Sequence, residues 1–371
     1  MPVKLAGPAH FIGLMSGTSL DGIDAALVQF DLTQFAGHLI HTVYLPYPEP
    51  LREKLLKIHF SGNDEIHRTA LLSNELSGLY GQAVSRLLAE SATAPDNIDA
   101  IGCHGQTVRH RPDAGYTIQL ANPSLLAELT GIAVVADFRS RDIAAGGQGA
   151  PLVPAFHAAA LRHPTIHRVI VNIGGISNLT DLPPSGKIIG FDCGPGNLLM
   201  DAWCQRHTSQ KFDHAGAWGL GGENLPELFK KLVAHTFFSA PAPKSAGREE
   251  FNLDWLISHL SGDESAQDVQ ATLLNLTTYG IAQAIETYSP RAQEIYICGG
   301  GAHNTALMQS LHTTLPGKLL ASTDALGISP DWLEAHAFAW LARQTLLGLP
   351  GNLTEVTGAR HPCVLGAVYP A

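Results

Sequence analysis

The sequence lacks the features that mark membrane proteins, nucleic-acid-binding proteins and zinc-stabilised domains. There is no run of 18 apolar residues and no long apolar segment near the N-terminus, so neither export nor a membrane span is supported and a cytoplasmic location is expected. No Lys/Arg run exceeds two residues and the net charge is -10, which argues against nucleic acid or an anionic membrane as a partner. The five cysteines are widely spaced without a C-x-x-C pair, and H-E-x-x-H is absent, so free thiols are expected.

What the sequence does contain is a large hydrophobic fraction with many turn-forming residues. Hydrophobic residues make up 45% and charged residues 15% of the 371, with 37 Gly and 23 Pro, a composition typical of buried strands joined by tight turns. The length exceeds the usual single core of about 100 to 200 residues, which favours two lobes. A small-molecule substrate fits this acidic chain. If it carries phosphates, backbone N–H groups and a metal ion must neutralise most of their charge.

Apolar periodicity predicts a mixed α/β chain whose two halves begin alike. The first half opens with a strand, a turn and a second strand within residues 11–30, and the second half opens in the same way within 168–182. Any apolar strand that ends in a glycine turn looks similar, so this repeat alone is weak. A segment rich in Gly, Ala and Pro at 146–151 sets the lobe boundary near residue 150. Further elements are expected at 51–88 (two helices), 98–103 and 187–191 (strands), 271–288 (helix), 294–298 (strand) and 329–347 (helix).

Three glycine-bearing turns follow apolar strands and are candidates for phosphate binding. They occupy residues 16–21, 192–197 and 299–302, and the last two each open a predicted helix. Glycine permits positive φ and close approach of backbone N–H groups to an anion, and a helix N-terminus favours negative charge. Glycine-rich turns are also common in α/β proteins of any function. Neither the Walker motif nor a helix-opening G-x-G-x-x-G is present, which excludes a P-loop and the dinucleotide fingerprint.

Two side chains stand out as candidates for chemistry. Asp192 follows the apolar segment 188–191 and precedes a glycine turn, at the edge of a sheet where α/β enzymes bind ligands. A carboxylate there can act as a general base, but Asp before a helix is also a common N-cap, and spacing alone leaves both interpretations open. Of the 18 scattered histidines, His104 is the candidate for a functional role.

A series of longer blocks runs through nearly the whole chain in a fixed order. They read MSGTSLDGID at 15–24, CHGQT at 103–107, ADFRSRD at 136–142, GGQGAPLVP at 146–154, GFDCGPGN at 190–197, KSAGRE at 244–249, CGGGAHN at 298–304 and WLEAHAFA at 332–339. These blocks closely resemble the anhydro-N-acetylmuramic acid kinases. The resemblance implies a duplicated, two-lobed actin-like ATPase fold of the acetate and sugar kinase/Hsp70/actin superfamily, with ATP and sugar in the cleft between the lobes. The expected lobes are 1–150 with 340–371, and 151–339.

The resemblance also implies a reaction and a set of site residues. The reaction converts 1,6-anhydro-N-acetylmuramic acid, ATP and water to N-acetylmuramic acid 6-phosphate and ADP in peptidoglycan recycling, with Mg²⁺ screening the phosphates. Asp192 matches the catalytic base, and Asp21 is a candidate for orienting the magnesium shell. The sugar-binding candidates are Thr107, Arg141 and Glu334, with the Arg141 fork suited to the lactyl carboxylate. The candidates for binding ATP phosphates are Ser16, Gly17, Thr18, Ser19, Leu20, Asp21, Gly22, Ile23, Asp24, Gly194, Gly196, Asn197, Gly299, Gly300 and Gly301.

Several alternatives stay open at this stage. Arg141 beside Asp142 could form a surface ion pair, and Glu334 in a helix could simply be solvated. A hexose or hexosamine kinase, in which Asp192 deprotonates a free hydroxyl, would use the same fold. A nucleotide-binding regulator that uses lobe closure as its output is a second alternative, disfavoured because no peptide-binding domain is added. The sequence does not give the oligomeric state, and a homodimer is left open.

Overall fold

The computed structural model describes residues 7–17, 20–31 and 36–371, and the chain divides into two compact units. Unit 1 comprises Met1–Leu161 with Trp332–Ala371, and unit 2 comprises Arg162–Asp331. The predicted lobes have the same discontinuous arrangement but different boundaries. The segments 151–161 and 332–339, which the prediction placed in the C-terminal lobe, belong to unit 1.

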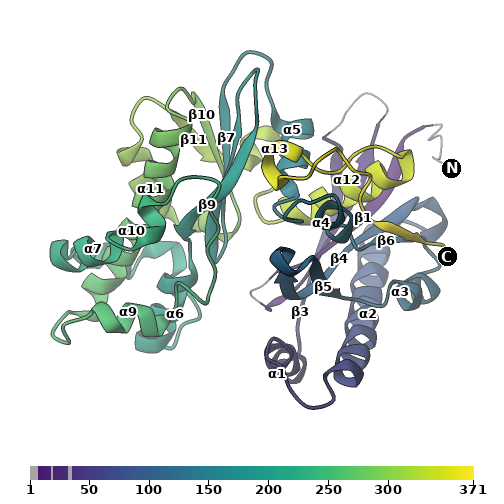
Figure 1. Ribbon diagram of the computed structural model, residues 1–371, viewed down its shortest axis with the longest axis horizontal. Coiled ribbons are helices and arrows are strands. Elements are labelled where there is room, and N and C mark those ends of the chain that lie inside the picture. The colour runs from purple at the N-terminus through teal and green to yellow at the C-terminus, as the bar shows by residue number, and fades with distance from the viewer. Residues whose placement is uncertain (1–6, 18–19, 32–35) are drawn as a thin grey trace. The chain divides into compact units, whose positions relative to one another are not determined.

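Unit 1 is built on one mixed sheet (Figure 1). In spatial order its strands are β12 (Ala367–Tyr369), β6 (Val134–Ala136), β4 (Ala100–Arg111), β1 (Ala9–Ser16), β2 (Gly22–Phe30) and β3 (His38–Pro46), and β5 (Tyr116–Leu120) pairs with β4. The strands β1, β2 and β3 form an antiparallel meander. By contrast, β4 runs parallel to β1, and β6 runs parallel to β4.

Side chains alternate along β1, so they point to both faces of the sheet, and helices cover both faces. Ile12 and Leu14 enter the core that is shared with α1 (Glu49–Ile58) and α2 (Glu65–Glu90). Gly13, between them, faces α12 (Leu333–Leu347), and a Cβ at this position would overlap the backbone of that helix. Glycine is therefore required where α12 lies directly on the strand. The other helices of unit 1 are α3 (Pro123–Thr130), α4 (Ser140–Ala144), α5 (Val153–Leu161) and α13 (Thr354–Thr357), with 3₁₀ turns at Pro95–Asn97 and Pro112–Ala114.

Unit 2 has a five-stranded sheet with its own hydrophobic core. In spatial order its strands are β11 (Leu319–Ser322), β10 (Glu294–Cys298), β7 (Arg168–Ile173), β8 (Ile176–Leu182) and β9 (Ile189–Pro195). Its helices are α6 (Leu198–Thr208), α7 (Pro226–Val233), α8 (Thr236–Ser239), α9 (Leu253–His259), α10 (Ala266–Tyr288) and α11 (Thr305–Thr314), with 3₁₀ turns at His214–Gly216, η4 (Gly219–Gly221), η5 (Gly300–His303) and Thr323–Leu326.

The two sheets share one topology. The order β3-β2-β1-β4-β6 in unit 1 corresponds to β9-β8-β7-β10-β11 in unit 2. In both, the first three strands form an antiparallel meander and the last two run parallel to the first. This confirms the predicted duplicated α/β fold, whose repeat was too weak in sequence to stand alone.

Local predictions were less accurate at element ends. The strand expected to end at Phe191 extends to Pro195, and the helix expected from 329 begins at Leu333. All five cysteines are buried free thiols, as predicted. Among the described residues, no helix has the length and hydrophobicity needed to cross a membrane.

Candidate functional site

The turn between β1 and β2 is the first predicted phosphate loop, and its Gly17 and Asp21 carbonyl groups are held by protein donors. The Gly17 carbonyl accepts hydrogen bonds from Leu20 N at 3.3 Å and from Gln106 Nε2 at 3.0 Å. Leu20 has a left-handed φ of 57° and a buried side chain, which anchors the end of the turn. Thr18 and Ser19 lie outside the described residues.

Ser16, a candidate for binding ATP phosphates, has a hydroxyl group that is engaged within the protein. The side chain is buried, with its Oγ 2.7 Å from the Tyr80 hydroxyl, and it donates to the Gly105 carbonyl at 3.1 Å. The side chain lies at the point where β1 and β4 pair, and its assignment to phosphate stays a prediction. Proximity in sequence to the turn gave no information about which face Ser16 occupies.

The second half of this loop belongs to β2. Gly22, Ile23 and Asp24 pair with β3, and Ile23 is fully buried. Asp21 is exposed, and Asp24 is partly buried. The pKa of Tyr44 is raised by burial and then by the charges of these two aspartates, so both carboxylates lie near its hydroxyl.

The aspartate expected to be the base lies inside a strand. Asp192 is part of β9, opposite Asn178 of β8, and the N-cap of α6 is Asn197. The N-cap interpretation of Asp192 is therefore wrong. The Asp192 N–H donates to the Lys244 carbonyl at 3.0 Å, which ties β9 to the segment that orients its carboxylate.

The Asp192 carboxylate is partly buried and receives one backbone donor. Burial raises the pKa of Asp192 from 3.8 to about 6, and the hydrogen bond from Ala246 N to Oδ2, at 2.9 Å, acts in the opposite direction. The Lys244 ammonium donates to the Phe237 carbonyl at 2.8 Å and lies 4.4 Å from the Phe237 ring centroid. Asp192 is therefore a fixed carboxylate whose pKa suits proton acceptance near neutral pH.

Two of the predicted phosphate donors in the second glycine turn are already engaged. Gly196 N donates to the Gly175 carbonyl and Asn197 N to the Gly174 carbonyl, both at 2.8 Å. These two N–H groups are engaged within the protein, and the assignment of Gly196 and Asn197 to phosphate stays a prediction. Gly194 lies in the β8–β9 ladder with a φ of 126°, and the Phe238 ring occupies the space beside its Cα. Residues 192–195 of the predicted turn belong to strand β9.

The third glycine turn lies beside the second at the ends of the parallel strands β7 and β10. Gly299 has a φ of 76°, and its N–H donates to the Pro330 carbonyl at 2.9 Å. A Cβ at Gly301 would overlap Ile173 of β7, whereas one at Gly300 would approach only the Asn197 amide, at 3.7 Å. Carboxyl ends of parallel strands are where α/β proteins bind ligands. Unit 2 therefore gathers residues 174–175, 196–197 and 299–301 in one place.

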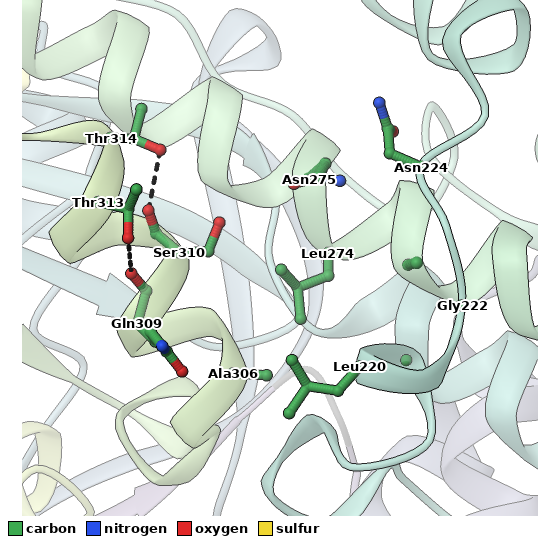
Figure 2. A pocket seen from close by; sticks show the side chains of 12 residues that line it. Leu220, Gly222, Asn224, Leu274, Asn275, Ala306, Gln309, Ser310, Thr313 and Thr314 are labelled. Atoms are coloured by element: carbon green, nitrogen blue, oxygen red, sulfur yellow. Dashed lines mark hydrogen bonds between the residues drawn. The ribbon is translucent and has the colours of Figure 1, made fainter.

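Unit 2 also has a cavity of about 480 Å³, between η4, α10 and α11. Figure 2 shows Leu220, Leu274 and Ala306 converging on it, with the amides of Asn224 and Asn275 at another side. An apolar floor with a few amide groups is typical of a small-molecule site. The sequence analysis missed these residues because the lining comes from three separate segments, none of which forms a motif.

The predicted sugar-binding residues all lie in unit 1. Thr107 of β4 is partly buried and accepts a hydrogen bond from Gln119 Nε2 at 3.2 Å. Glu334 lies in the first turn of α12, where burial raises its pKa and the charge of Arg139 lowers it. Glu334 is therefore not simply solvated, as one interpretation of the sequence allowed.

Arg139 is not among the predicted site residues, yet it interacts with His104, Gly149 and Glu334. Its Nε and Nη2 atoms lie 3.1 and 2.8 Å from His104 Nε2, and its Nη1 donates to the Gly149 carbonyl at 2.8 Å. Burial lowers the pKa of Arg139 to about 10, and the charges of Glu334 and then Asp142 oppose this shift. Burial and Arg139 hold the pKa of His104 well below its usual range, so the ring is neutral with its proton on Nδ1.

Arg141 and Asp142 are neighbours in sequence with opposite environments. Arg141 is exposed on α4, whereas Asp142 is fully buried and accepts from Gly149 N, Asn352 Nδ2 and Thr357 Oγ1 at 2.6 to 2.7 Å. Asp142 thus anchors the loop that follows α4, and the surface ion pair considered from the sequence is ruled out. The exposed guanidinium of Arg141 remains accessible.

The duplicated strand order, the tight turn after the first strand of each sheet and the carboxylate of raised pKa define a two-unit α/β protein with a duplicated fold and a candidate general base. The chain belongs to the anhydro-N-acetylmuramic acid kinase family, whose model matches residues 9–371. It is 59% identical over 365 residues to the anhydro-N-acetylmuramic acid kinase of Nitrosospira multiformis, covering 98% of this chain and 99% of that one. It is 58% identical to the protein of the same name from Nitrosomonas europaea, covering 98% and 100%. Among solved structures, the activator of the 2-hydroxyisocaproyl-CoA dehydratase from Clostridium difficile, with bound ADPNP, aligns with a TM-score of 0.48 at 11% identity, covering 91% of this chain and 95% of that one.

Proposed function

We propose that this protein is an ATP-dependent kinase that converts 1,6-anhydro-N-acetylmuramic acid and water to N-acetylmuramic acid 6-phosphate, with release of ADP. Family membership over residues 9–371 supports the substrate and the reaction. The observation that carries the mechanism is the Asp192 carboxylate, which is oriented by Ala246 N and has a pKa raised to about 6 by burial. In a bacterial cell this activity would belong to cytoplasmic peptidoglycan recycling.

Asp192 acts as the general base in this proposal. It takes a proton from a water molecule whose oxygen forms a bond to C1 of the sugar, while the bond between C1 and O6 breaks. The freed O6 attacks the γ-phosphorus of ATP, the bond to the β,γ-bridging oxygen breaks, and ADP leaves. A base near its own pKa at neutral pH contributes typically about 10²- to 10⁴-fold to such a step.

In unit 2, the nucleotide is assigned to the cavity and to the glycine turn at 299–301. The cavity beside α11 is lined by apolar side chains and the amides of Asn224, Asn275 and Gln309, a combination that suits a purine. Gly17 and the rest of the β1–β2 turn are assigned to the phosphates, because the carbonyl groups of Gly17 and Asp21 are bound by the protein.

A magnesium ion fits the acidic end of the β1–β2 turn. The exposed carboxylate of Asp21 and the nearby Asp24 supply oxygen ligands, and Mg²⁺ is commonly held by one or two carboxylates together with phosphates and water. The described residues contain no cluster of three metal-binding side chains, so the nucleotide phosphates would complete the coordination. Bound there, the ion would neutralise charge on the phosphates.

Thr107, Arg141 and Glu334 are assigned to the sugar. The exposed guanidinium of Arg141 suits the lactyl carboxylate, and Glu334, held beside Arg139, suits a sugar hydroxyl. The buried pair of Arg139 and His104 would keep this region in place.

One assay tests the proposed function. The protein is incubated with Mg-ATP and either the anhydro sugar or a free hexosamine, and ADP release and product mass are followed. We expect a product heavier than the anhydro sugar by one phosphoryl group and one water. Addition of the phosphoryl group alone would support a simple sugar kinase, and absence of turnover on every sugar would refute the proposal.

A further inference from the structure

The β1–β2 turn accepts hydrogen bonds from side chains to which no role has been given. Two of its carbonyl oxygens, those of Gly17 and Asp21, each accept two hydrogen bonds from the protein. The Gly17 carbonyl takes one from Gln106 Nε2, at 3.0 Å. The Asp21 carbonyl takes one from the Tyr44 hydroxyl and one from Tyr47 N, both at 2.9 Å.

The orientation of the Gln106 amide is itself fixed. Gln106 is fully buried on β4, and its Oε1 accepts a hydrogen bond from the Tyr47 hydroxyl at 3.2 Å. Because Oε1 is bonded to Tyr47, the amide NH₂ is directed at Gly17. Burial raises the pKa of Tyr47 to about 12, so this hydroxyl stays protonated and keeps donating across the physiological range.

A phosphate-binding turn must keep its carbonyl groups away from the ligand. Carbonyl oxygens carry partial negative charge and repel phosphate, whereas backbone N–H groups attract it. A turn whose carbonyls are free to rotate outward would bind an anion less well. Donors placed beneath the turn remove that freedom before the ligand arrives, which lowers the cost of ordering the turn on binding.

We propose that Gln106, Tyr47 and Tyr44 are positioning residues for the nucleotide phosphates, and that they act by holding the Gly17 and Asp21 carbonyls inside the protein. This inference rests on the proposed function for its ligand, a nucleoside triphosphate. None of the three side chains touches the reacting atoms in this scheme. Their effect is on nucleotide affinity, not on the sugar.

The core of unit 1 supplies a matched control. The Ser77 hydroxyl, fully buried on α2, donates to the Asn122 carbonyl at 3.1 Å and accepts from Asn122 N at 2.7 Å. Ser77→Ala therefore removes a buried hydroxyl from the same unit and leaves the Gly17 and Asp21 carbonyls bound. Any general effect of losing a buried hydrogen bond in this core will appear in this variant as well.

The test uses the full chain and measures nucleotide and sugar constants separately. For Gln106→Met, which keeps the volume and loses the donor, we expect the Kd for ADP by calorimetry and the KM for ATP to rise about tenfold, equivalent to 1.4 kcal/mol. Gln106→Glu should be worse than Gln106→Met, because a carboxylate oxygen then faces the Gly17 carbonyl. For Tyr44→Phe we expect a rise of about threefold, and for Ser77→Ala no change in either constant, while the KM for the sugar stays within about twofold throughout.

The possible outcomes separate this inference from the proposed function. If the wild-type chain binds ADP but turns over no sugar, the proposed function fails, and the ADP constants still test the positioning residues. The inference is overturned if Gln106→Met and Tyr44→Phe bind ADP as the wild type does, or if Ser77→Ala weakens ADP binding equally. Should Gln106→Met not fold, Tyr44→Phe decides alone, because Tyr44 is 43% exposed and its loss does not threaten the core.

Discussion

Replacing Asp192, the proposed base, should raise the stability of the protein and lower its activity. Burial raises the pKa of Asp192 from 3.8 to about 6, so the folded protein must hold a charge in a place that disfavours it. The shift of about 2.2 units corresponds to a cost of at most about 3 kcal/mol when the group is ionised. Asp192→Asn removes that cost, keeps an oxygen that can accept from Ala246 N, and removes the base.

The sign of the stability effect follows from the direction of the pKa shift. Because the folded state binds the proton more tightly than the unfolded state, the wild type loses stability as pH rises from about 4 to about 6, and the loss is constant above that. Urea denaturation should therefore find Asp192→Asn more stable than the wild type at pH 7.5, by up to about 3 kcal/mol, with the difference disappearing near pH 4.

Activity should move in the other direction. With a pKa of about 6, Asp192 is about 90% ionised at pH 7 and about 10% at pH 5, so kcat/KM should rise with pH and level off above about 7. Asp192→Asn should lose roughly 10²- to 10⁴-fold in kcat. The variant should still bind ADP.

Asp201 of α6 provides a matched control. Burial, and then the charge of Asp213, raise the pKa of Asp201 to about 7, and the proposed reaction does not use this residue. Asp201→Asn should therefore gain stability at pH 8 as Asp192→Asn does, with kcat unchanged. Near-wild-type turnover of Asp192→Asn, or a pH profile that is flat between 5 and 7, would refute the assignment of Asp192 as the base.

Other assignments lead to separate expectations. Asp142→Ala should lower the free energy of unfolding by about 3 kcal/mol in urea, because three buried donors lose their partner, whereas Arg141→Ala should change it by less than about 0.5 kcal/mol and raise the KM for the sugar. Arg139→Lys should lower the Tm and raise the sugar KM, since an ammonium cannot replace the bonds to both His104 and Gly149. Leu220→Ala, which trims an exposed side chain at the cavity, should raise the KM for ATP about threefold with no change in Tm. Unchanged stability of Asp142→Ala, or an unchanged KM in Arg141→Ala, Arg139→Lys or Leu220→Ala, would contradict the corresponding expectation.

The sequence predicted the fold well where hydrophobic patterning was strong. The strand–turn–strand openings of both halves and the strand before Gly299 are present as expected, because strands buried on both faces read as continuous apolar runs. The boundary between the units was misplaced for a physical reason. The segment from Trp332 lies with unit 1 because α12 packs on β1, through contacts between residues more than 300 positions apart.

The site was predictable as a set of segments but not as a set of contacts. Asp192 stood out through its position after a strand, yet the donor that orients it, Ala246 N, is 54 residues away. Arg139 and Gln106 lay within recognised blocks but were passed over, because neither position reveals what its side chain touches. Contacts of this kind depend on strand register and helix packing, which local pattern does not specify.

In both sheets, carbonyl groups of the first turn accept hydrogen bonds from the protein, but the donors differ. In unit 1 the carbonyls of Gly17 and Asp21 are each bound by one backbone N–H and by one side chain, Gln106 from β4 or Tyr44 from β3. In unit 2 the carbonyls of Gly174 and Gly175, in the β7–β8 turn, are bound by backbone N–H groups at the start of α6. In both cases the carbonyl oxygens of a glycine turn are held by the protein, as an anion-binding turn requires. The N–H groups of residues 196–198 therefore serve the neighbouring turn rather than a ligand, which is why a helix N-terminus that looks suited to phosphate in the sequence is already occupied.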